Sequence, residues 1–297
     1  MSGRTRGRLR GAAVALALGI AIAAAGSIAV QPVSPAVVAV DTGSAAGRPV
    51  RIQYREAADT FGDLYLPSSG TGPYPVVVLV HGGGWSQNRD LAQFDRQAKL
   101  LAGHGIAVWN VEYRRVNGAG GWPTTLTDVG DAVHALGGVV QWRSGNRLDL
   151  SRVHLAGHSA GGQLAAWAAG RPVDGVRIRS LTVLAAVLDP AYAATAGRDL
   201  FVQRLLGGTP AEVPDRYRFA SPMDNLPSGL AISAVHGDRD HVVADEQSRR
   251  YIAAAKVRNT AELRILPGVG HAEFVDPDSS AWAAAESAIL DHVARLS

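Results

Sequence analysis

Cysteine is absent from this chain of 297 residues. Its absence excludes disulfide bonds, thiolate nucleophiles and thiolate metal ligands together. The nine histidines form no HExxH motif, which is the pattern of many zinc hydrolases. The sequence therefore predicts neither a metal ion nor another cofactor.

Acidic residues are absent from positions 1–39, where four arginines at positions 4, 6, 8 and 10 are the only charged side chains. Without these four arginines the formal net charge of the chain falls from +3 to −1. The basic character of the sequence thus belongs to its beginning, and the remainder has no excess of positive charge for a phosphate backbone. We expect no nucleic-acid partner.

Residues 11–30 follow these arginines as an uncharged, alanine-rich stretch. A basic segment, then an apolar segment, then small residues is typical of a secretory signal peptide. Cleavage could follow Ala25 or Ala39. Because 20 uncharged residues can just span a bilayer, an uncleaved anchor is the alternative. We expect 1–39 to be a signal peptide or anchor plus linker, on a protein that is secreted or extracytoplasmic and membrane-attached only if this segment is retained.

The remainder, 50–297, is predicted to be one catalytic domain in which short apolar runs alternate with longer amphipathic segments. Strands are expected at 50–56, 61–67, 74–80, 106–113, 152–157, 180–187, 230–237 and 261–268. Helical patterns cover 88–105, 125–143, 160–170, 245–259 and 281–296. This alternation predicts an α/β fold with a mainly parallel sheet of about eight strands and helices on both faces.

Such sheets bind ligands beyond the carboxyl ends of their strands, and the polar motifs of this sequence follow predicted strands. The segment 189–229 separates two strands by about forty residues and has a helical pattern near its middle. A connection of this length predicts an inserted lid.

The first motif is Gly157-His158-Ser159-Ala160-Gly161, which matches G-x-S-x-G. It follows an apolar strand and opens an alanine-rich helix, the setting of a nucleophile elbow. Small neighbours are needed there because the serine backbone is strained and the chain approaches the helix closely. His158 is expected to pack beside the elbow or to line a pocket.

The second motif, His81-Gly82-Gly83-Gly84-Trp85, follows the run YPVVVLV. Glycines without side chains allow backbone N–H groups to point into a cleft, where they can stabilise the oxyanion of an acyl-transfer intermediate. We assign this role to Gly83 and Gly84, together with the N–H of Ala160. Trp85 either lines the pocket or packs in the core.

A nucleophilic serine needs a base, and the base needs an acid that orients it. His271 lies in a glycine-flanked loop after the strand at 261–268, and Asp240 follows the strand at 230–237. Spacing favours Asp240 over Asp238, and Asp189 is a further alternative acid. The expected triad is Ser159, Asp240 and His271, in the chain order of α/β-hydrolases.

The motifs HGGGW, GHSAGG, HGDRDHVV and GVGHAEF, in this order, resemble the esterase/lipase branch of the α/β-hydrolases. The stretch 113–170 and the sequence SPMDNLP are similar to the group of acetyl esterases, feruloyl-esterase-like domains and kynurenine formamidases. The resemblance implies the α/β-hydrolase fold, the same triad and the same oxyanion donors. Only about thirty domain residues precede HGGG, so the substantial N-terminal cap of hormone-sensitive-lipase-type enzymes is missing.

These residues predict a serine hydrolase that cleaves small-molecule carboxylic esters through an acyl-enzyme intermediate. An amide or peptide hydrolase, arylformamidase-like or dipeptidyl-peptidase-like, is the first alternative. A non-catalytic binding protein on a hydrolase scaffold is the second, although such a protein would not need all of these groups.

Overall fold

A computed structural model of the chain describes residues 48–197 and 200–296. The expected signal peptide or anchor at 1–39 lies outside the described residues, as do both candidate cleavage sites. None of the described helices combines the length and the apolar character that crossing a bilayer requires.

Eight strands form a single sheet in the order β1-β2-β4-β3-β5-β6-β7-β8. Strand β2 runs antiparallel to β1 and to β4, and all other neighbouring strands are parallel. The predicted mainly parallel sheet of about eight strands is therefore confirmed. The strands are β1 (Val50–Gln53), β2 (Phe61–Tyr65), β3 (Tyr74–Val80), β4 (Ala107–Val111), β5 (Leu148–His158), β6 (Ile178–Leu184), β7 (Ala231–Gly237) and β8 (Thr260–Leu266).

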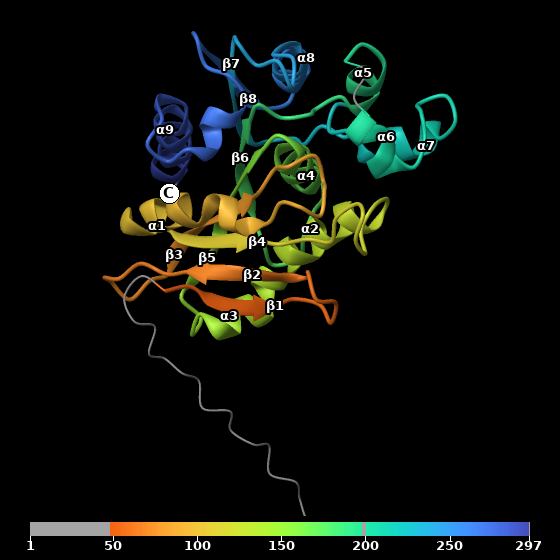
Figure 1. The fold of residues 1–297 in the computed structure, drawn as a ribbon. Coiled ribbons are helices and arrows are strands. Elements are labelled where there is room, and N and C mark those ends of the chain that lie inside the picture. The colour runs from red at the N-terminus through yellow and green to blue at the C-terminus, as the bar shows by residue number, and fades with distance from the viewer. Residues whose placement is uncertain (1–47, 198–199, 297) are drawn as a thin grey trace, which may run out of the picture. The chain divides into compact units, whose positions relative to one another are not determined.

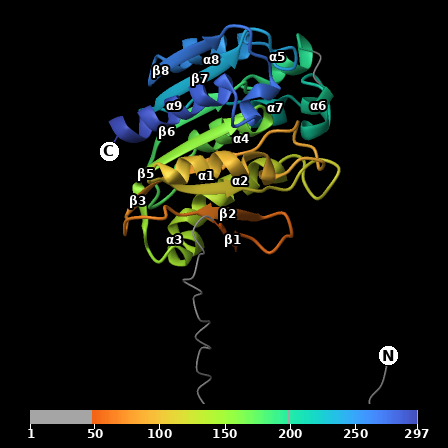
Figure 2. The same ribbon diagram turned by 60° about the vertical axis from the view of Figure 1, so that its left-hand side comes forward.

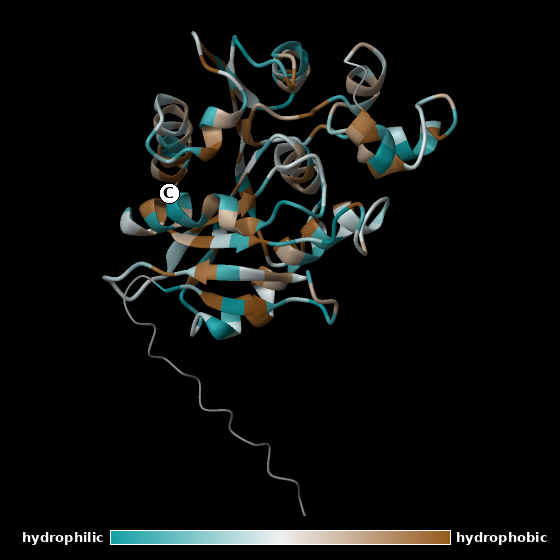
Figure 3. Cartoon of the chain, in the orientation of Figure 1, coloured by the Kyte–Doolittle hydropathy of each residue, from teal (hydrophilic) through white to brown (hydrophobic). Residues whose placement is uncertain are grey.

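The central strands are continuous apolar runs because helices cover both faces of the sheet. In β3, Val76, Val78 and Val80 belong to one apolar cluster and Val77 and Leu79 to the other. The first cluster includes residues of helices α2, α3, α4 and α8, and the second includes residues of α1 and α9 (Figure 1). Figure 3 shows apolar residues in the sheet and mixed apolar and polar residues on the surrounding helices.

The helices that cover the sheet are α1 (Asp95–Gly103), α2 (Thr124–His134), α3 (Val139–Arg143), α4 (Ala160–Ala169), α8 (Glu246–Ala255) and α9 (Ser280–Arg295). Short 3-10 helices lie at Leu91–Phe94, Ala135–Gly137 and Ala272–Val275. Most of these agree with the expected helical segments, with two differences.

The prediction of a single helix at 125–143 was wrong. The helical path is interrupted at Gly138, whose backbone dihedrals are φ −125° and ψ −108°. Glycine is favourable at such a break because it has the widest conformational freedom. The helix expected from position 88 begins later, with a 3-10 turn at Leu91 that is capped by the Asp90 carboxylate. Residues 86–90 consequently form a loop, which proves important for the site.

The segment expected to form a lid contains three short helices, α5 (Pro190–Thr195), α6 (Leu200–Leu206) and α7 (Pro214–Ala220). The helical pattern recognised in its middle corresponds to α6. These helices lie together beyond α4 in both ribbon views (Figures 1 and 2).

The sheet is twisted, so that β1 and β8 run in clearly different directions in Figure 1. Because β5, β7 and β8 are parallel, their carboxyl ends meet at one edge of the sheet. Ser159 follows β5, Asp240 follows β7 and His271 follows β8. The topology thus brings together three polar residues that are far apart in the chain.

Candidate active site

Ser159 occupies the sharp turn between β5 and α4, with backbone dihedrals of φ 55° and ψ −122°. Few residues other than glycine adopt a positive φ, and strained backbone of this kind concentrates at functional sites. The turn has the geometry of the nucleophile elbow that the G-x-S-x-G motif predicts. It presents the Ser159 side chain at the carboxyl edge of the sheet.

The glycines around Ser159 are required by close backbone contacts. A Cβ atom on Gly161 would lie 2.2 Å from the carbonyl oxygens of Val80 and His81. A Cβ atom on Gly157 would lie 2.4 Å from the carbonyl oxygen of Gly161. The end of β3, and with it the HGGG segment, can approach the elbow this closely only because these positions have no side chain.

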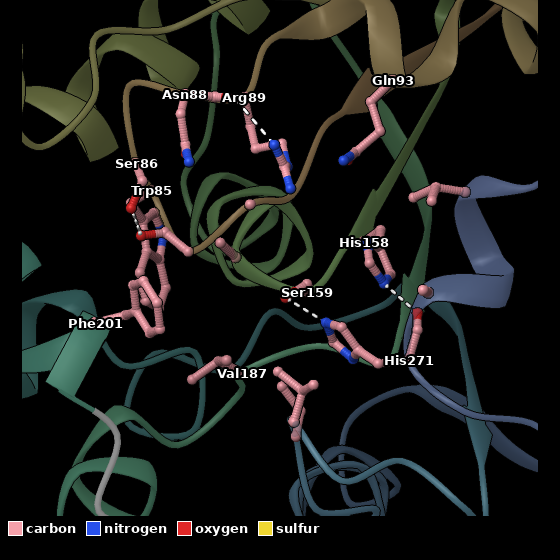
Figure 4. Close-up of a pocket in the computed structure, with 17 residues that line it drawn as sticks. Trp85, Ser86, Asn88, Arg89, Gln93, His158, Ser159, Val187, Phe201 and His271 are labelled. Atoms are coloured by element: carbon pink, nitrogen blue, oxygen red, sulfur yellow. Dashed lines mark hydrogen bonds between the residues drawn. The ribbon is translucent and has the colours of Figure 1, made fainter.

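The three expected triad residues form one hydrogen-bonded series. The Nε2 atom of His271 lies 2.9 Å from the Oγ atom of Ser159, as the dashed line in Figure 4 shows. The Nδ1 atom of the same ring lies 2.7 Å from Oδ2 of Asp240. A carboxylate can only accept, so Nδ1 carries the proton and Nε2 is available to accept the Ser159 proton.

Asp240 has a buried carboxylate that is fully hydrogen-bonded. Its Oδ1 accepts hydrogen bonds from the backbone N–H groups of Val242 and Val243, each at 2.8 Å. Its Oδ2 lies 3.3 Å from Nε2 of His236, in addition to its contact with His271. Burial alone would raise the pKa of Asp240, but the hydrogen bonds from His236, His271 and Val243 outweigh burial and hold this pKa well below its usual range.

The two alternative acids lie elsewhere. Asp238 accepts a hydrogen bond from the backbone N–H of Gly268 at 2.7 Å, as a turn residue does. Asp189 caps helix α5 through the N–H of Tyr192 and forms an ion pair with Arg250 at 3.1 Å. Of the three candidates only Asp240 contacts His271.

The expected oxyanion residues Gly83, Gly84 and Ala160 line the same pocket as Ser159. Within residues 48–197 and 200–296, no acceptor is hydrogen-bonded to their backbone N–H groups. The N–H of Gly82, by contrast, donates to Oε1 of Gln93 at 3.0 Å. The loop therefore offers free donors at the positions that the motif predicts.

A buried carboxylate, which sequence reasoning missed, supports the loop that begins with His81. Glu112 is 1% exposed and lies 3.0 Å from Nε2 of His81. It also accepts the N–H groups of Leu91 and Tyr113 and pairs with Arg115 at 2.9 Å. Its position at the end of β4, within the run VEYRR, was the only sequence signal.

The two residues that were expected either to pack or to line a pocket do both. Trp85 is 1% exposed, and its Nε1 donates to Oε1 of Gln163 at 3.1 Å. His158 is also buried, and its Nε2 donates to the backbone carbonyl of His271 at 3.0 Å. Both line the pocket beside Ser159 (Figure 4).

This pocket has a volume of about 390 Å³ and is partly open to solvent. One wall is apolar and includes Phe201 of α6, a residue of the expected lid segment. Ten lining residues that sequence reasoning did not single out are Ser86, Asn88, Arg89, Gln93, Val187, Phe201, Val242, Val243, Ala272 and Val275. In the part of the chain that the structure describes, no group of three or more His, Asp or Glu side chains has the arrangement of a metal site.

Residues 62–174 match the BD-FAE family model. The chain is also 30% identical to esterase LipC of Mycobacterium tuberculosis over 222 residues, which cover 68% of this chain and 53% of that protein. It therefore spans about half the length of this curated relative.

Two solved structures share the fold of this chain at less than 25% sequence identity. A bifunctional GH43-CE protein of Bacteroides eggerthii matches with a TM-score of 0.69 and 23% identity, over 85% of this chain and 38% of that chain. A thermophilic esterase of Thermogutta terrifontis matches with a TM-score of 0.68 and 20% identity, over 84% and 92% of the two chains.

Proposed function

We propose that this chain, a member of the α/β-hydrolase superfamily, hydrolyses carboxylic esters with Ser159 as nucleophile, His271 as base and Asp240 as orienting acid. One observation carries the proposal: a single imidazole ring contacts the Ser159 hydroxyl at 2.9 Å and a buried carboxylate at 2.7 Å. The esterase relative supports the choice of esters over amides.

The reaction follows from these contacts. Nε2 of His271 takes the Ser159 proton as Oγ attacks the ester carbonyl carbon, and the carbonyl oxygen becomes an oxyanion. The tetrahedral intermediate then collapses, and His271 donates the proton to the departing alcohol oxygen. Water repeats the sequence on the acyl-enzyme, which releases the acid and restores Ser159.

Two electrostatic features favour the charged states along this path. The Asp240 carboxylate stays ionised and stabilises the imidazolium that forms on His271. The free N–H groups of Gly83, Gly84 and Ala160 are held before reaction and can receive the oxyanion, with Ala160 at the amino end of α4. Loss of one such donor costs about 3 kcal/mol of transition-state stabilisation in enzymes of this type.

The test is a set of initial rates on p-nitrophenyl esters from acetate to palmitate, methyl ferulate, N-formylkynurenine and aminoacyl p-nitroanilides. Ser159→Ala is the control, and we expect ester turnover in the wild type and a loss of about 10⁴-fold or more in the variant. The dependence of the rates on acyl chain length shows how long an acyl group the pocket accepts.

Three other outcomes contradict the proposal. Turnover of amides without turnover of esters would identify an amide or peptide hydrolase. Equal rates for Ser159→Ala and the wild type would mean that another residue is the nucleophile. If a folded sample hydrolyses none of the substrates and is not labelled by a fluorophosphonate probe, the protein is a binding protein.

We also propose that the protein acts outside the cytoplasm, on the sequence pattern of residues 1–39. Cell fractionation followed by amino-terminal sequencing of the mature protein tests this. An intact amino terminus on a cytoplasmic protein would contradict it.

A further inference from the structure

Arg89 is a cation at the pocket that contains Ser159. It is exposed, and its one hydrogen bond from Nη1 to a described residue goes to the backbone carbonyl of Asn88, at 3.2 Å. No described acidic side chain pairs with it, and no aspartate or glutamate lines the pocket. The nearby Asp240 carboxylate is fully buried behind His271.

The backbone of Arg89 is anchored. Its carbonyl oxygen accepts a hydrogen bond from Nη1 of Arg115, a residue that is 3% exposed and pairs with Asp59 and Glu112. The stem of Arg89 lies directly over Gly83, where a Cβ atom would be 2.4 Å from Cγ of the arginine. The backbone and the stem of Arg89 are therefore held beside Gly83, one of the proposed oxyanion donors.

Two amides accompany the guanidinium. Oε1 of Gln93 is occupied by the N–H of Gly82, which leaves the Nε2 donor of this side chain for a ligand. Figure 4 shows the nitrogen-bearing ends of Asn88 and Gln93 on either side of Arg89, directed toward the interior of the pocket. Donors thus gather on this side of the pocket.

The opposite side has a different chemistry. Val187 and Phe201 lie across the pocket from Arg89 in Figure 4, and Val242 and Val243 also line it. A substrate with one apolar part and one negatively charged part matches this division. A guanidinium in a pocket that no described aspartate or glutamate lines favours a carboxylate over a neutral polar group, because it binds a carboxylate through charge-assisted hydrogen bonds.

We propose that Arg89 is a specificity-determining residue that selects esters carrying a free carboxylate, such as half-esters of dicarboxylic acids or acylated hydroxy acids. This inference rests on the proposed ester hydrolysis at Ser159 and adds the class of substrate. The carboxylate can belong to the acyl group or to the alcohol, and the experiment below separates these two sources.

The experiment compares kcat/KM for charged and neutral esters of equal length in a pH-stat. Monoethyl esters of C4 to C8 dicarboxylic acids are paired with ethyl esters of the corresponding monocarboxylic acids. Acetates of ω-hydroxy acids are paired with acetates of the corresponding alcohols. We expect the wild type to prefer the charged member about 5- to 20-fold in one of the two series, with a maximum at one chain length.

The variants test whether Arg89 is the cause. Arg89→Gln should reduce the preference to within about twofold of unity, and Arg89→Lys should restore part of it. Arg258→Gln is the matched control, because Arg258 is also exposed and free of acidic partners but lines a separate depression at the other end of β7 and β8. This control should keep the full preference. Added NaCl should weaken the preference in the wild type.

Binding provides a readout that is independent of turnover. Ser159→Ala and Ser159→Ala/Arg89→Gln are titrated with monoethyl adipate and with ethyl hexanoate, and ligand-detected NMR gives the affinities. Stronger binding of the charged ester that Arg89→Gln removes supports the inference even if the wild type hydrolyses neither. The inference is overturned if the wild type shows equal kcat/KM and equal affinity for charged and neutral esters. It is also overturned if Arg89→Gln keeps the preference for charged esters. Ester turnover without such a preference would leave the proposed hydrolase activity intact.

Discussion

The side chain of His158 donates a hydrogen bond from Nε2 to the backbone carbonyl of His271 at 3.0 Å, and so links the residue before Ser159 to a loop 113 positions away. Because the carbonyl can only accept, Nε2 carries the proton, and the buried Nδ1 atom has no hydrogen-bond partner within 48–197 and 200–296. Burial, with repulsion from His271, lowers the pKa of His158 to about 3. The ring is therefore neutral near pH 7 and holds the His271 loop against the turn at Ser159.

His158 and a second buried histidine, His154, predict a loss of stability in mild acid. Burial also lowers the pKa of His154 to about 3. Both pKa values are depressed, so the unfolded chain binds more protons than the folded one between pH 6.5 and pH 3. Stability then falls as the pH decreases through this window. Within this window, each histidine changes the free energy of unfolding by about 1.4 kcal/mol per pH unit.

Urea unfolding at pH 7, 6, 5.5 and 5 measures this slope. The variant His154→Gln retains a partner for Ser180 but cannot be protonated, so its slope should be smaller than that of the wild type by about 1 kcal/mol per pH unit. Parallel slopes for the two proteins would show that His154 is protonated in the folded state.

Asp240→Asn should reduce kcat by about 10³-fold or more while the protein stays folded. The amide cannot stabilise the imidazolium, and its NH₂ group disturbs the tautomer of His271. Asp238→Asn is the matched control, since an asparagine oxygen can still accept from Gly268, and its rate should stay within about twofold of the wild type. If steady-state kinetics showed a large loss of kcat in Asp238→Asn and little loss in Asp240→Asn, Asp238 would be the orienting acid.

Gly161→Ala should destabilise the protein by about 3 kcal/mol or more, because its Cβ atom would overlap the carbonyl oxygens of Val80 and His81. Separation of the HGGG segment from the elbow should lower kcat as well. The control Gly103→Ala lies at the end of α1, where no atom is within 4 Å of the added Cβ. Its unfolding midpoint should equal or exceed that of the wild type, and a similar loss in both variants would contradict the steric account.

Glu112→Gln should destabilise the fold by about 3 kcal/mol, because it leaves the buried Arg115 guanidinium without its nearest carboxylate. Since Glu112 also contacts His81 and the N–H of Leu91, we expect the oxyanion loop to loosen and kcat to fall about tenfold. Guanidinium unfolding and initial rates check both effects. Asp215→Asn, which removes an exposed pair with Arg218, should change neither.

The mainly parallel sheet could be predicted because its evidence is local. The run YPVVVLV coincides with β3, since a strand buried on both faces must be apolar throughout. Helix boundaries were less accurate. Helix α2 ends at His134, and Gly138 separates the following 3-10 turn from α3, although the apolar pattern continues through both. The cap at Asp90 placed Asn88 and Arg89 in a loop.

The sequence by itself determined the candidate chemistry of this protein. Gly83, Ser159 and His271 follow strands in turns whose glycines are recognisable along the chain, and parallel strands bring such turns to one edge. The residues within each motif are neighbours in the chain, so their spacing carries the information.

Only the tertiary structure decided which side chains meet. It brought Asp240 rather than Asp238 to His271, placed Glu112 against His81 and left Arg89 at the pocket with no acidic partner among the described side chains. These relationships join residues of separate loops and strands. They depend on the packing and twist of the sheet as a whole, which no local pattern of residues encodes.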